Sequence, residues 1–285
     1  MKDINPETGM DDFGTILRRK IQIIMSKFAS RFGFRKFDPQ NFKVEHLEII
    51  IPQLPLPFHN YRILHISDIH YDQWISLDRL IGVVGLVNEN SPDLIAITGD
   101  FVSYMVNEQI EQDMISQLKK LKAADAIVAV LGNHDHWSGV ERVRRILKKS
   151  NIKEISNDVF TIQKQGANLH IAGVDSAWVK KDQLDLVLRK TPPDGPAILL
   201  AHEPDLAVKS GATKRFSLQL SGHSHGGQLI IPGLGTPFRG PLFRKYPHGK
   251  YMVGDMVQYT SRGIGTNGYW IRINCPPEIT VINLA

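Results

Sequence analysis

The stretch that most constrains this chain is residues 131–137, Leu-Gly-Asn-His-Asp-His-Trp. It directly follows the apolar run 126–130, which predicts a buried strand. We expect Gly132 to allow a sharp turn that lifts Asn133 and His134 out of the edge of a sheet. An amide oxygen is a neutral metal ligand and a neighbouring imidazole can donate a proton. The stretch therefore suggests metal-assisted hydrolysis.

Four further apolar runs are each followed by a carboxylate or an imidazole. These side chains are Asp68 and His70 after residues 62–67, Asp100 after 93–99, His202 after 197–201, and His223 and His225 after 216–222. In open α/β sheets, sites form at the carboxyl ends of the strands. The i, i+2 spacing within two of these pairs places both members on one face of an extended chain. The sequence thus predicts one site assembled from several strand ends.

Apolar strand patterns alternate with helical patterns from residue 62 onward, which favours parallel βαβ units in an α/β fold with mixed sheets. The patterns predict strands at 42–51, 62–67, 93–98, 126–131, 159–164, 168–173, 197–201 and 216–221. They predict helices near 76–90, 107–122, 139–149, 182–190 and 204–210. The last third, rich in Gly and Pro, predicts loops and the strands 228–231, 250–254, 256–260 and 278–283.

The chain divides into an N-terminal region, residues 1–40, and a catalytic domain, residues 41–285. Residues 13–36 contain seven Lys or Arg, no acid, and apolar residues at helical spacing. This pattern predicts a helix in peripheral contact with a membrane, its cations on anionic headgroups. The alternative is a helix packed on the catalytic domain with a solvated basic face. Nucleic acid is a less favoured partner, because aromatic stacking platforms are missing.

Composition narrows the class of protein. Of 285 residues, 42% are hydrophobic and 22% are charged, which is typical of a soluble globular chain. The single cysteine, Cys275, excludes an intrachain disulfide and a thiolate zinc site. No apolar run reaches the ~18 residues of a membrane span, and the N-terminus lacks the pattern of a secretory signal. We therefore expect a cytoplasmic protein, with peripheral attachment to the inner face of the membrane as a further possibility.

The candidate ligands combine hard oxygens, from Asp68, Asp100 and Asn133, with imidazoles. Mixed oxygen and nitrogen ligands without thiolates suit Mn, Fe or Zn better than Ca or Mg, and we expect two divalent ions, Mn by preference. Two metals about 3.5–4 Å apart that share a carboxylate can hold a hydroxide for in-line attack on a phosphate.

The ordered series Asp-x-His, Gly-Asp, Gly-Asn-His-Asp, a later His and Gly-His-x-His resembles the calcineurin-like metallophosphoesterase superfamily. This resemblance implies a four-layer α/β/β/α sandwich with the site at the strand ends. It implies one metal held by Asp68, His70 and His225, a second held by Asn133, His202 and His223, and Asp100 as the bridge. It also implies that His134 protonates the leaving oxygen and that Asp135 orients His134 through a hydrogen bond.

Residues 222–228, 232–235, 261–265 and 276–280 extend the resemblance to the YkuE/YaeI-type bacterial branch. Members are often membrane-associated, many through an N-terminal anchor, and some are UDP-2,3-diacylglucosamine pyrophosphatases. In place of that N-terminal anchor, this chain has the basic amphipathic segment within residues 13–36. The resemblance implies hydrolysis of a phosphoester or pyrophosphate bond in a lipid-linked or otherwise amphipathic substrate, by metal-hydroxide attack with His134 as general acid.

Two other functions remain open: a general phosphodiesterase or phosphatase acting on soluble nucleotides or phosphoproteins, and a metal-binding scaffold without turnover. Polar side chains near the motifs are candidate substrate ligands, although an arginine in such a surface loop is more often simply solvated. They are His136, Arg239, Arg244, Arg262 and Asn267. Histidines in or beside strands are interpreted as structural, among them His65 and His170.

Overall fold

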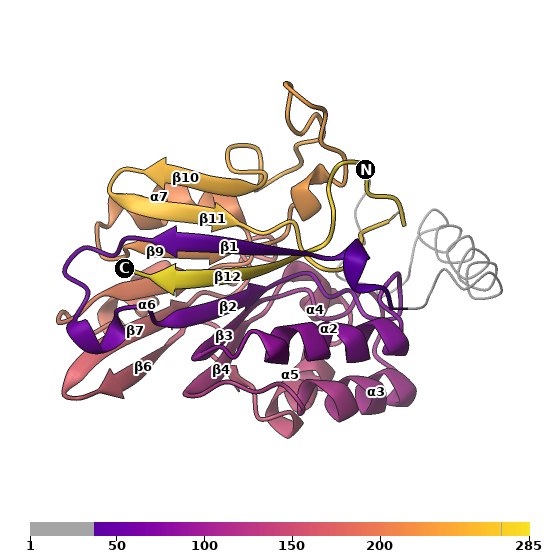
Figure 1. Ribbon diagram of the computed structural model, residues 1–285, viewed down its shortest axis with the longest axis horizontal. Coiled ribbons are helices and arrows are strands. Elements are labelled where there is room, and N and C mark those ends of the chain that lie inside the picture. Colours follow the sequence, from indigo (N-terminus) through magenta and orange to yellow (C-terminus); the bar gives the residue numbers. More distant parts are fainter. Residues whose placement is uncertain (1–36, 269) are drawn as a thin grey trace.

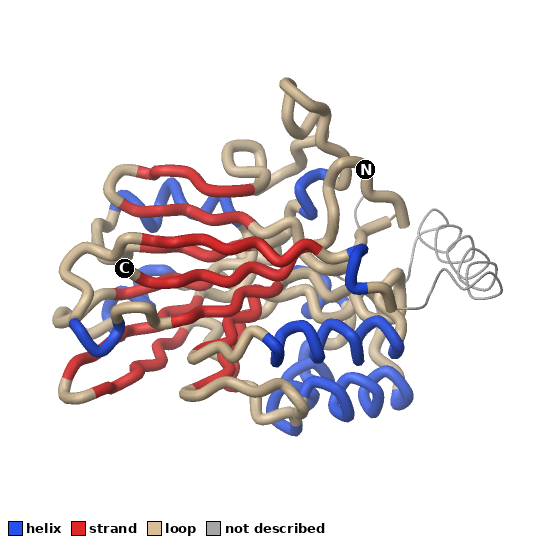
Figure 2. Tube along the Cα trace, viewed as in Figure 1, coloured by secondary structure: helices blue, strands red, loops and turns tan. Residues whose placement is uncertain are grey.

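The computed structural model describes residues 37–268 and 270–285, which form two six-stranded sheets with helices (Figures 1 and 2). The first sheet contains, in spatial order, β1 (Lys43–Ile49), β12 (Glu278–Leu284), β2 (Arg62–Ile66), β3 (Leu94–Thr98), β4 (Ala126–Val130) and β5 (Lys153–Glu154). The second contains β10 (Gly249–Val253), β11 (Met256–Thr260), β9 (Leu218–Ser221), β8 (Ala197–Leu200), β7 (Ala167–Gly173) and β6 (Asp158–Lys164).

Both sheets are mixed, as predicted. Strands β2, β3 and β4 run parallel to one another, and so do β7, β8, β9 and β11. Antiparallel neighbours join at β12–β2, β10–β11 and β6–β7. Buried on both faces, the central parallel strands are almost continuously apolar. Their carboxyl ends lie at one edge of each sheet, and the loops that leave these two edges form the site.

The two sheets pack face to face, which makes the inner layers of the sandwich. Successive residues of a strand point to opposite faces. Ile63 therefore enters the core between the sheets with Ile198 and Leu218, whereas Leu64 and Ile66 enter the core under the helices. Burying one such aliphatic side chain stabilises the fold by roughly 1.5–3 kcal/mol, so the apolar core between the sheets also fixes their relative position.

Helices cover the outer faces and complete the four layers. The first sheet is covered by α2 (Leu77–Glu89), α3 (Glu108–Leu118) and α5 (Val140–Lys149), and the second by α6 (Leu184–Lys190) and α7 (Ala207–Ala212). Polar caps set two of the helix starts: the side chain of Ser76 accepts from Arg79 N, and that of Asn107 accepts from Ile110 N. The predicted α/β/β/α sandwich is confirmed.

Several short elements escaped the sequence patterns. They are α4 (Asn133–Trp137), β5, and the 3-10 helices η1 (Pro39–Asn41), η2 (Leu56–Phe58) and η4 (His225–Gly227), whereas η3 (Pro204–Leu206) lies within the helix predicted near 204–210. The predicted strand 228–231 is wrong. Only isolated bridges, Leu229 to Ile273 and Ile231 to Gly235, form there, because Pro232 and Gly233 turn the chain back at once.

The predicted helix within residues 13–36 lies outside the described residues, and the domain boundary at residue 40 stays a prediction. Among residues 37–268 and 270–285, no helix combines the length and the apolar character needed to cross a membrane.

Candidate active site

Asp100 follows β3, and residues that follow β2, β8 and β9 converge on it. Its Oδ2 atom lies 3.4 Å from Nε2 of His70 and 3.2 Å from Nε2 of His202. These two histidines belong to separate groups of potential ligands, one on each side of the carboxylate. A carboxylate in this position can serve two metal ions at once, which is the geometry that a dinuclear centre requires.

The first group is Asp68, His70 and His225, all buried. Nε2 of His225 lies 3.3 Å from Asp68 Oδ1 and 3.1 Å from Nε2 of His70. The second group is Asp100, His202 and His223, with Nδ1 of His223 3.2 Å from Nε2 of His202. Both groups place potential ligand atoms within 4.8 Å of one another. The structure therefore brings together Asp68, His70 and His225 of the first expected set, and His202 and His223 of the second set with Asp100.

Asn133 is a further candidate ligand because of its buried amide oxygen. It is the first residue of α4, and its buried Oδ1 atom accepts no hydrogen bond from the described residues. A buried amide oxygen without a partner is costly, so such an atom usually marks a ligand that the fold expects. A divalent cation beside His202 and His223 would satisfy it, and the donor set fits a hard or borderline metal.

The protonation of the imidazoles also fits metal binding. Burial lowers the pKa of His223 to about 4 and holds that of His225 well below the ordinary value, so both rings are neutral and able to ligate. Burial also disfavours the charged ring of His202, but the carboxylates of Asp100 and Asp68 outweigh it and raise the pKa of His202 well above the usual range. A bound cation would replace that proton.

Left-handed backbone directs most of these side chains. The φ angles of Asp68, His70, Asp100, His223 and His225 are all positive, between 46° and 68°. The expectation that each i, i+2 pair projects from an extended chain is therefore wrong. Such conformations cost a non-glycine residue about 1–2 kcal/mol and concentrate at functional sites. The turns that begin directly after each strand aim the ligands inward.

Gly132 is needed for space and not for a turn. Its φ of −102° is accessible to any residue, contrary to the sequence interpretation. A Cβ atom at this position would lie 2.2 Å from Asp100 Oδ1, which is well inside contact distance. The absence of a side chain thus lets the loop after β4 approach the central carboxylate.

Asp135 does not hold the ring of His134. One of its carboxylate oxygens accepts from the backbone N–H groups of Asp100 and Gly132, both at 2.9 Å, and the other from Phe101 N at 2.8 Å. The orienting hydrogen bond predicted between Asp135 and His134 is therefore replaced by a clamp between two loops. It keeps the loop after β3 in register with the loop after β4.

His134 lies with His70 and Asp100 in a third group of potential ligand atoms. Its backbone N–H donates to Asp100 Oδ1 at 2.9 Å, and its Nδ1 lies 3.3 Å from the carbonyl oxygen of Ser103. A carbonyl can only accept, so the ring proton is on Nδ1 and Nε2 carries a lone pair. Burial lowers the pKa of His134 to about 4, although the charge of Asp100 opposes this.

Aromatic rings border the site; the sequence suggests Trp137, which follows His136, as a residue at the substrate mouth, but it does not reveal Trp178 or Phe243. The ring of Trp137 lies 4.9 Å from that of His134 and 6.2 Å from that of Trp178, centroid to centroid. Trp178 and Phe243 lie 5.3 Å and 5.5 Å from His223. The rings come from α4 and from the loops that follow β7 and β9, so no local sequence pattern connects them.

The predicted substrate ligands are mostly engaged elsewhere. Nε2 of His136 is 2.7 Å from Asp175 Oδ1, so it joins the loops after β4 and β7. Arg262 pairs with Glu278 at 2.6 Å and Glu45 at 2.7 Å, at the edge of the first sheet, and is not open to a phosphate. Arg262 is thus held by acids distant in sequence, whereas the contact of His136 with Asp175 does not exclude a contact with substrate, and the role of His136 in substrate binding stays a prediction.

The other three candidates lie in exposed loops. Arg239 donates to the carbonyl oxygens of Thr236 and Arg244, while Arg244 itself is exposed. Asn267 is exposed, and its backbone N–H donates to Gln228 Oε1 at 2.6 Å. Among the described residues, no contact joins these three side chains to the ligand groups, so their role in substrate binding stays a prediction.

Arg272 is a residue of the site that the sequence did not reveal. Its guanidinium donates to the carbonyl oxygens of Arg262 (2.8 Å), Gly263 (3.2 Å), Gly265 (3.0 Å) and Cys275 (3.2 Å), and lies 3.4 Å from Nδ1 of His225. The loop that it holds is hydrogen-bonded to Asp68, through Gly265 N at 2.7 Å from the Asp68 carbonyl oxygen. Arg272 thus supports two potential ligands from behind.

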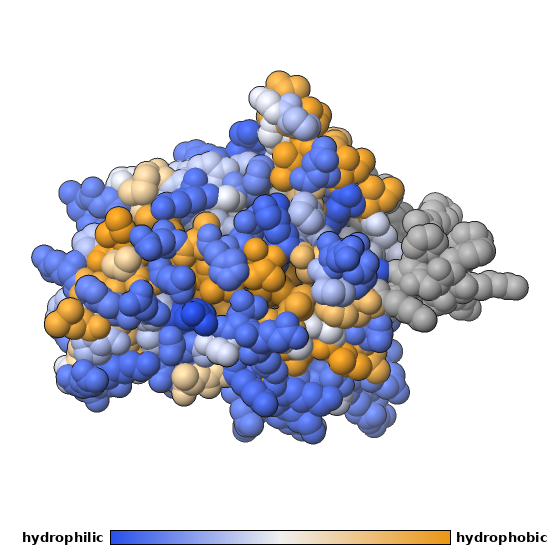
Figure 3. Space-filling view, in the orientation of Figure 1, coloured by the Kyte–Doolittle hydropathy of each residue, from blue (hydrophilic) through white to orange (hydrophobic). Residues whose placement is uncertain are grey.

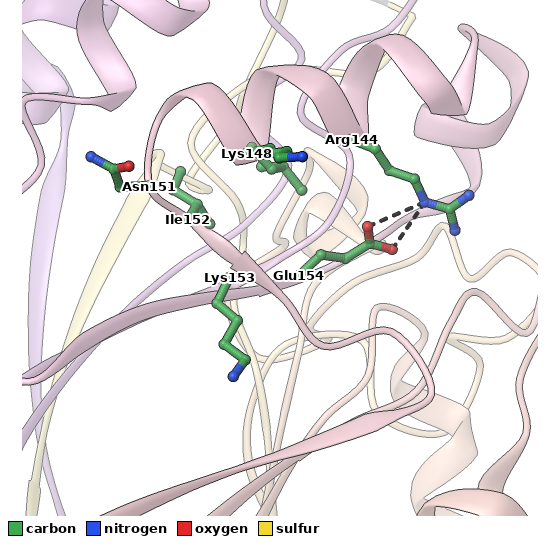
Figure 4. A pocket seen from close by; sticks show the side chains of 7 residues that line it. Arg144, Lys148, Asn151, Ile152, Lys153 and Glu154 are labelled. Atoms are coloured by element: carbon green, nitrogen blue, oxygen red, sulfur yellow. Dashed lines mark hydrogen bonds and ion pairs between the residues drawn. The ribbon is translucent and has the colours of Figure 1, made fainter.

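A separate hollow lies beside the carboxyl end of α5 (Figure 4). It is lined by Arg144, Leu147, Lys148, Asn151, Ile152, Lys153 and Glu154. The arginine in this lining, Arg144, is paired with Glu154 at 3.2 Å and Glu141 at 2.8 Å. None of the potential metal ligands lines this hollow, so it is not part of the site described above.

Two adjoining ligand groups at the joined strand ends of an α/β/β/α sandwich define a metal-dependent phosphoesterase. Residues 61–227 match the family model described as calcineurin-like phosphoesterase, and the chain belongs to this family, which comprises hydrolases that typically bind divalent metals.

Three relatives show the similarity over most of the chain. The chain is 30% identical to the uncharacterized metallophosphoesterase YkuE of Bacillus subtilis, over 89% of each protein. It is 30% identical to the phosphodiesterase YaeI of Escherichia coli, over 94% of this chain and 98% of YaeI. It is 29% identical to the uncharacterized metallophosphoesterase YkoQ of Bacillus subtilis, over 76% of this chain and 81% of YkoQ.

Proposed function

We propose that this hydrolase uses two divalent cations to cleave a phosphodiester or pyrophosphate bond in an amphipathic substrate. The observation that carries the proposal is the position of Asp100, whose Oδ2 lies between His70 and His202. We assign one cation to Asp68, His70 and His225 and the other to Asn133, His202 and His223, with Asp100 shared. Mn is the metal that we favour, with Fe or Zn as alternatives, because the ligands mix oxygen and imidazole nitrogen.

When bound, the two cations would supply an activated water and neutralise charge on the phosphate. The chain holds the ligands rigidly for this purpose. The carboxylate of Asp135 fixes the loops that carry Asp100 and Asn133, and Arg272 fixes the loop behind Asp68 and His225. Such preorganisation avoids rearrangement of the site as charge develops on the substrate.

His134 is assigned as the group that protonates the leaving oxygen. Its Nδ1 is held by the Ser103 carbonyl, so Nε2 is the atom that remains for the substrate. The negative charge of a bound phosphate favours a protonated imidazole and raises its pKa. His134 would therefore acquire its second proton as the substrate binds and donate it as the leaving group departs.

An amphipathic substrate is supported by the aromatic border. Trp137, Trp178 and Phe243 lie next to His134 and His223 and offer apolar surface directly beside the phosphate position. A small inorganic or phosphoprotein substrate would leave these rings without a partner. UDP-2,3-diacylglucosamine combines a pyrophosphate with acyl chains and is the specific compound that we would test.

Hydrolysis of a chromogenic aryl phosphodiester tests the first part of the proposal. We expect the metal-stripped protein to be inactive and Mn²⁺ to restore turnover. A protein that rebinds metal but hydrolyses neither the chromogen nor UDP-diacylglucosamine would instead be a scaffold.

Acylation tests the second part. We expect UDP-diacylglucosamine to be cleaved with a higher kcat/KM than its deacylated form, because the acyl chains add binding energy at the aromatic border. Equal values for the two forms would favour a general phosphodiesterase of soluble nucleotides.

A further inference from the structure

Two neighbouring segments beside the site expose large apolar side chains. We call residues 228–248 the outer loop and residues 270–274 the shoulder. Leu234 and Phe238 of the outer loop are 79% and 64% exposed, and Ile271 and Ile273 of the shoulder are 57% and 50% exposed. The outer loop projects from the top of the molecule in Figure 1, and Figure 3 shows hydrophobic residues gathered over it and beneath it.

The outer loop and the shoulder form one built surface. Ile230 N donates to the Ile273 carbonyl at 3.0 Å, and Ile273 N donates to the Gln228 carbonyl at 2.9 Å. The Asn274 side chain donates to the Ile230 carbonyl at 3.2 Å. These bonds hold the exposed side chains of both segments together, so their exposure is a property of an ordered surface.

The outer loop is also anchored at the site. Thr236 donates through Oγ1 to the carbonyl oxygen of Gly226, the residue after His225, at 3.0 Å. Farther along the loop, the backbone N–H groups of Arg244 and Lys245 donate to the Asp205 carboxylate at 2.9 and 3.0 Å. Just before them, Phe243 lies against His223. One continuous segment therefore carries the exposed apolar tip and part of the border of the site.

Cations outnumber acids around this surface, although the carboxylate of Asp205 also contacts the outer loop. Residues 206–277 contain one acid, Asp255, and nine Lys or Arg. Three of these cations, Arg239, Arg244 and Lys245, are exposed in the outer loop itself. Apolar side chains flanked by cations match an anionic bilayer, whose headgroups attract the cations and whose interior accepts the apolar groups.

We infer that the outer loop and the shoulder dock this enzyme onto the surface of an anionic lipid bilayer, with Leu234 and Phe238 inserted at the interface. The convex shape favours a bilayer, because fluid lipids can close around a projecting tip whereas a protein partner would need a matching cavity. This surface is distinct from residues 13–36. It explains how an amphipathic substrate reaches the site, and in this respect it rests on the proposed function, but docking is measured without turnover.

The first experiment measures binding of the full chain to vesicles of phosphatidylcholine with and without phosphatidylglycerol, by co-sedimentation. We expect Leu234→Ser with Phe238→Ser to weaken binding to the anionic vesicles at least tenfold, because each side chain loses apolar burial. Arg244→Gln with Lys245→Gln should weaken it roughly fivefold per charge, with a smaller effect on neutral vesicles.

The matched control is Ile50→Ser with Leu56→Ser. These side chains are also highly exposed, at 73% and 82%, but they lie in the connector after β1, away from the outer loop. We expect this variant to bind as the unchanged chain does. The thermal unfolding midpoint of every variant shows whether it has folded, so weaker binding is not mistaken for misfolding.

A fluorescent label gives a second and independent measurement. Cys275 is buried, so an environment-sensitive dye will label Leu234→Cys selectively. We expect its emission to shift to the blue on addition of phosphatidylglycerol vesicles, while the same dye on Leu56→Cys does not respond.

The inference is wrong if the Leu234 and Phe238 substitutions leave vesicle binding unchanged and the label at residue 234 does not respond. That result would assign any membrane contact to other parts of the chain. It is also wrong if the unchanged chain binds no vesicles and the same substitutions abolish self-association, because the surface would then be a protein interface. Failure of the hydrolysis assays alone would leave the docking result intact and would refute only the proposed function.

Discussion

The outer loop begins shortly after His225, one of the potential metal ligands. It differs from the loops that hold these ligands in length, burial and backbone conformation. The ligand loops are short and buried, and several of their residues have left-handed backbone. The outer loop is longer, acid-free, and exposes apolar side chains at its tip. The comparison teaches that one edge of the sandwich carries two functions: rigid strand-end turns position charge, and a projecting loop meets the surroundings.

The largest expected effect comes from changing Asp100, the carboxylate that both ligand groups share. Replacing Asp100 with Ala should remove both cations and abolish turnover, because one side chain serves both ligand groups. Elemental analysis of the purified variant measures its metal content. Asp185→Ala, which removes an exposed acid of α6, should change neither quantity. Retention of two metals by the Asp100 variant would refute the assignment of the bridge.

The next largest effect is expected on turnover alone, with metal binding unchanged. His134→Asn should keep the metal content and lower turnover by ~10²-fold or more, because the leaving oxygen loses its proton donor. A substrate with a good leaving group should be slowed much less. The exposed residue His59 provides the control, and His59→Asn should be fully active. Equal slowing of good and poor leaving groups would remove His134 from the role of acid.

Arg272 belongs to the shoulder but contacts His225 and the loop beside Asp68, so a change there tests whether the two regions depend on each other. A lysine has three donors on a single nitrogen and lacks the planar fork with which Arg272 reaches four carbonyls, so Arg272→Lys should weaken metal affinity by about 10–100-fold. Metal titration monitored by calorimetry measures this change. Arg215→Lys is the matched control, because Arg215 also donates to backbone carbonyls, those of Pro192 and Asp194. It should leave metal affinity unchanged; equal losses would mean that Arg272 acts on stability alone.

The smallest expected effect lies in the sheet beneath the ligand loops. His65 is buried against Thr98, and burial lowers its pKa from 6.5 to about 3. The folded state therefore favours the neutral ring. Its contribution to stability is complete above pH 6.5 and is lost as the pH falls toward 3, by up to about 1.4 kcal/mol per pH unit.

Urea unfolding between pH 7 and pH 5 measures this contribution. We expect the stability of the unchanged chain to fall more steeply than that of His65→Gln, which lacks the titrating ring. Parallel curves would show that His65 does not titrate differently in the folded and unfolded states.

Local patterns in the sequence predicted mixed sheets and one site at several strand ends, whereas the four-layer arrangement and the division of the ligands into two groups were implied by the family resemblance. Period-two and helical patterns predicted most strands and helices, because burial of one face imposes a period on the chain. Ligand types directly after buried strands predicted a common site, because parallel strands end at one edge of a sheet. The prediction of a strand at 228–231 is wrong because Pro232 and Gly233 turn the chain directly after this apolar run.

Contacts between distant segments decided what the sequence could not. The sequence determined that Asp68, Asp100 and His202 would share an edge, but the packing of one sheet on the other placed their atoms within ligand distance. The same packing turned Asp135 into a clamp on three backbone amides and Arg262 into a partner of Glu278. It also brought Trp178, Phe243 and Arg272 to the site. A side chain's type and its neighbours along the chain predict what it can do, whereas its partners across the fold decide what it does.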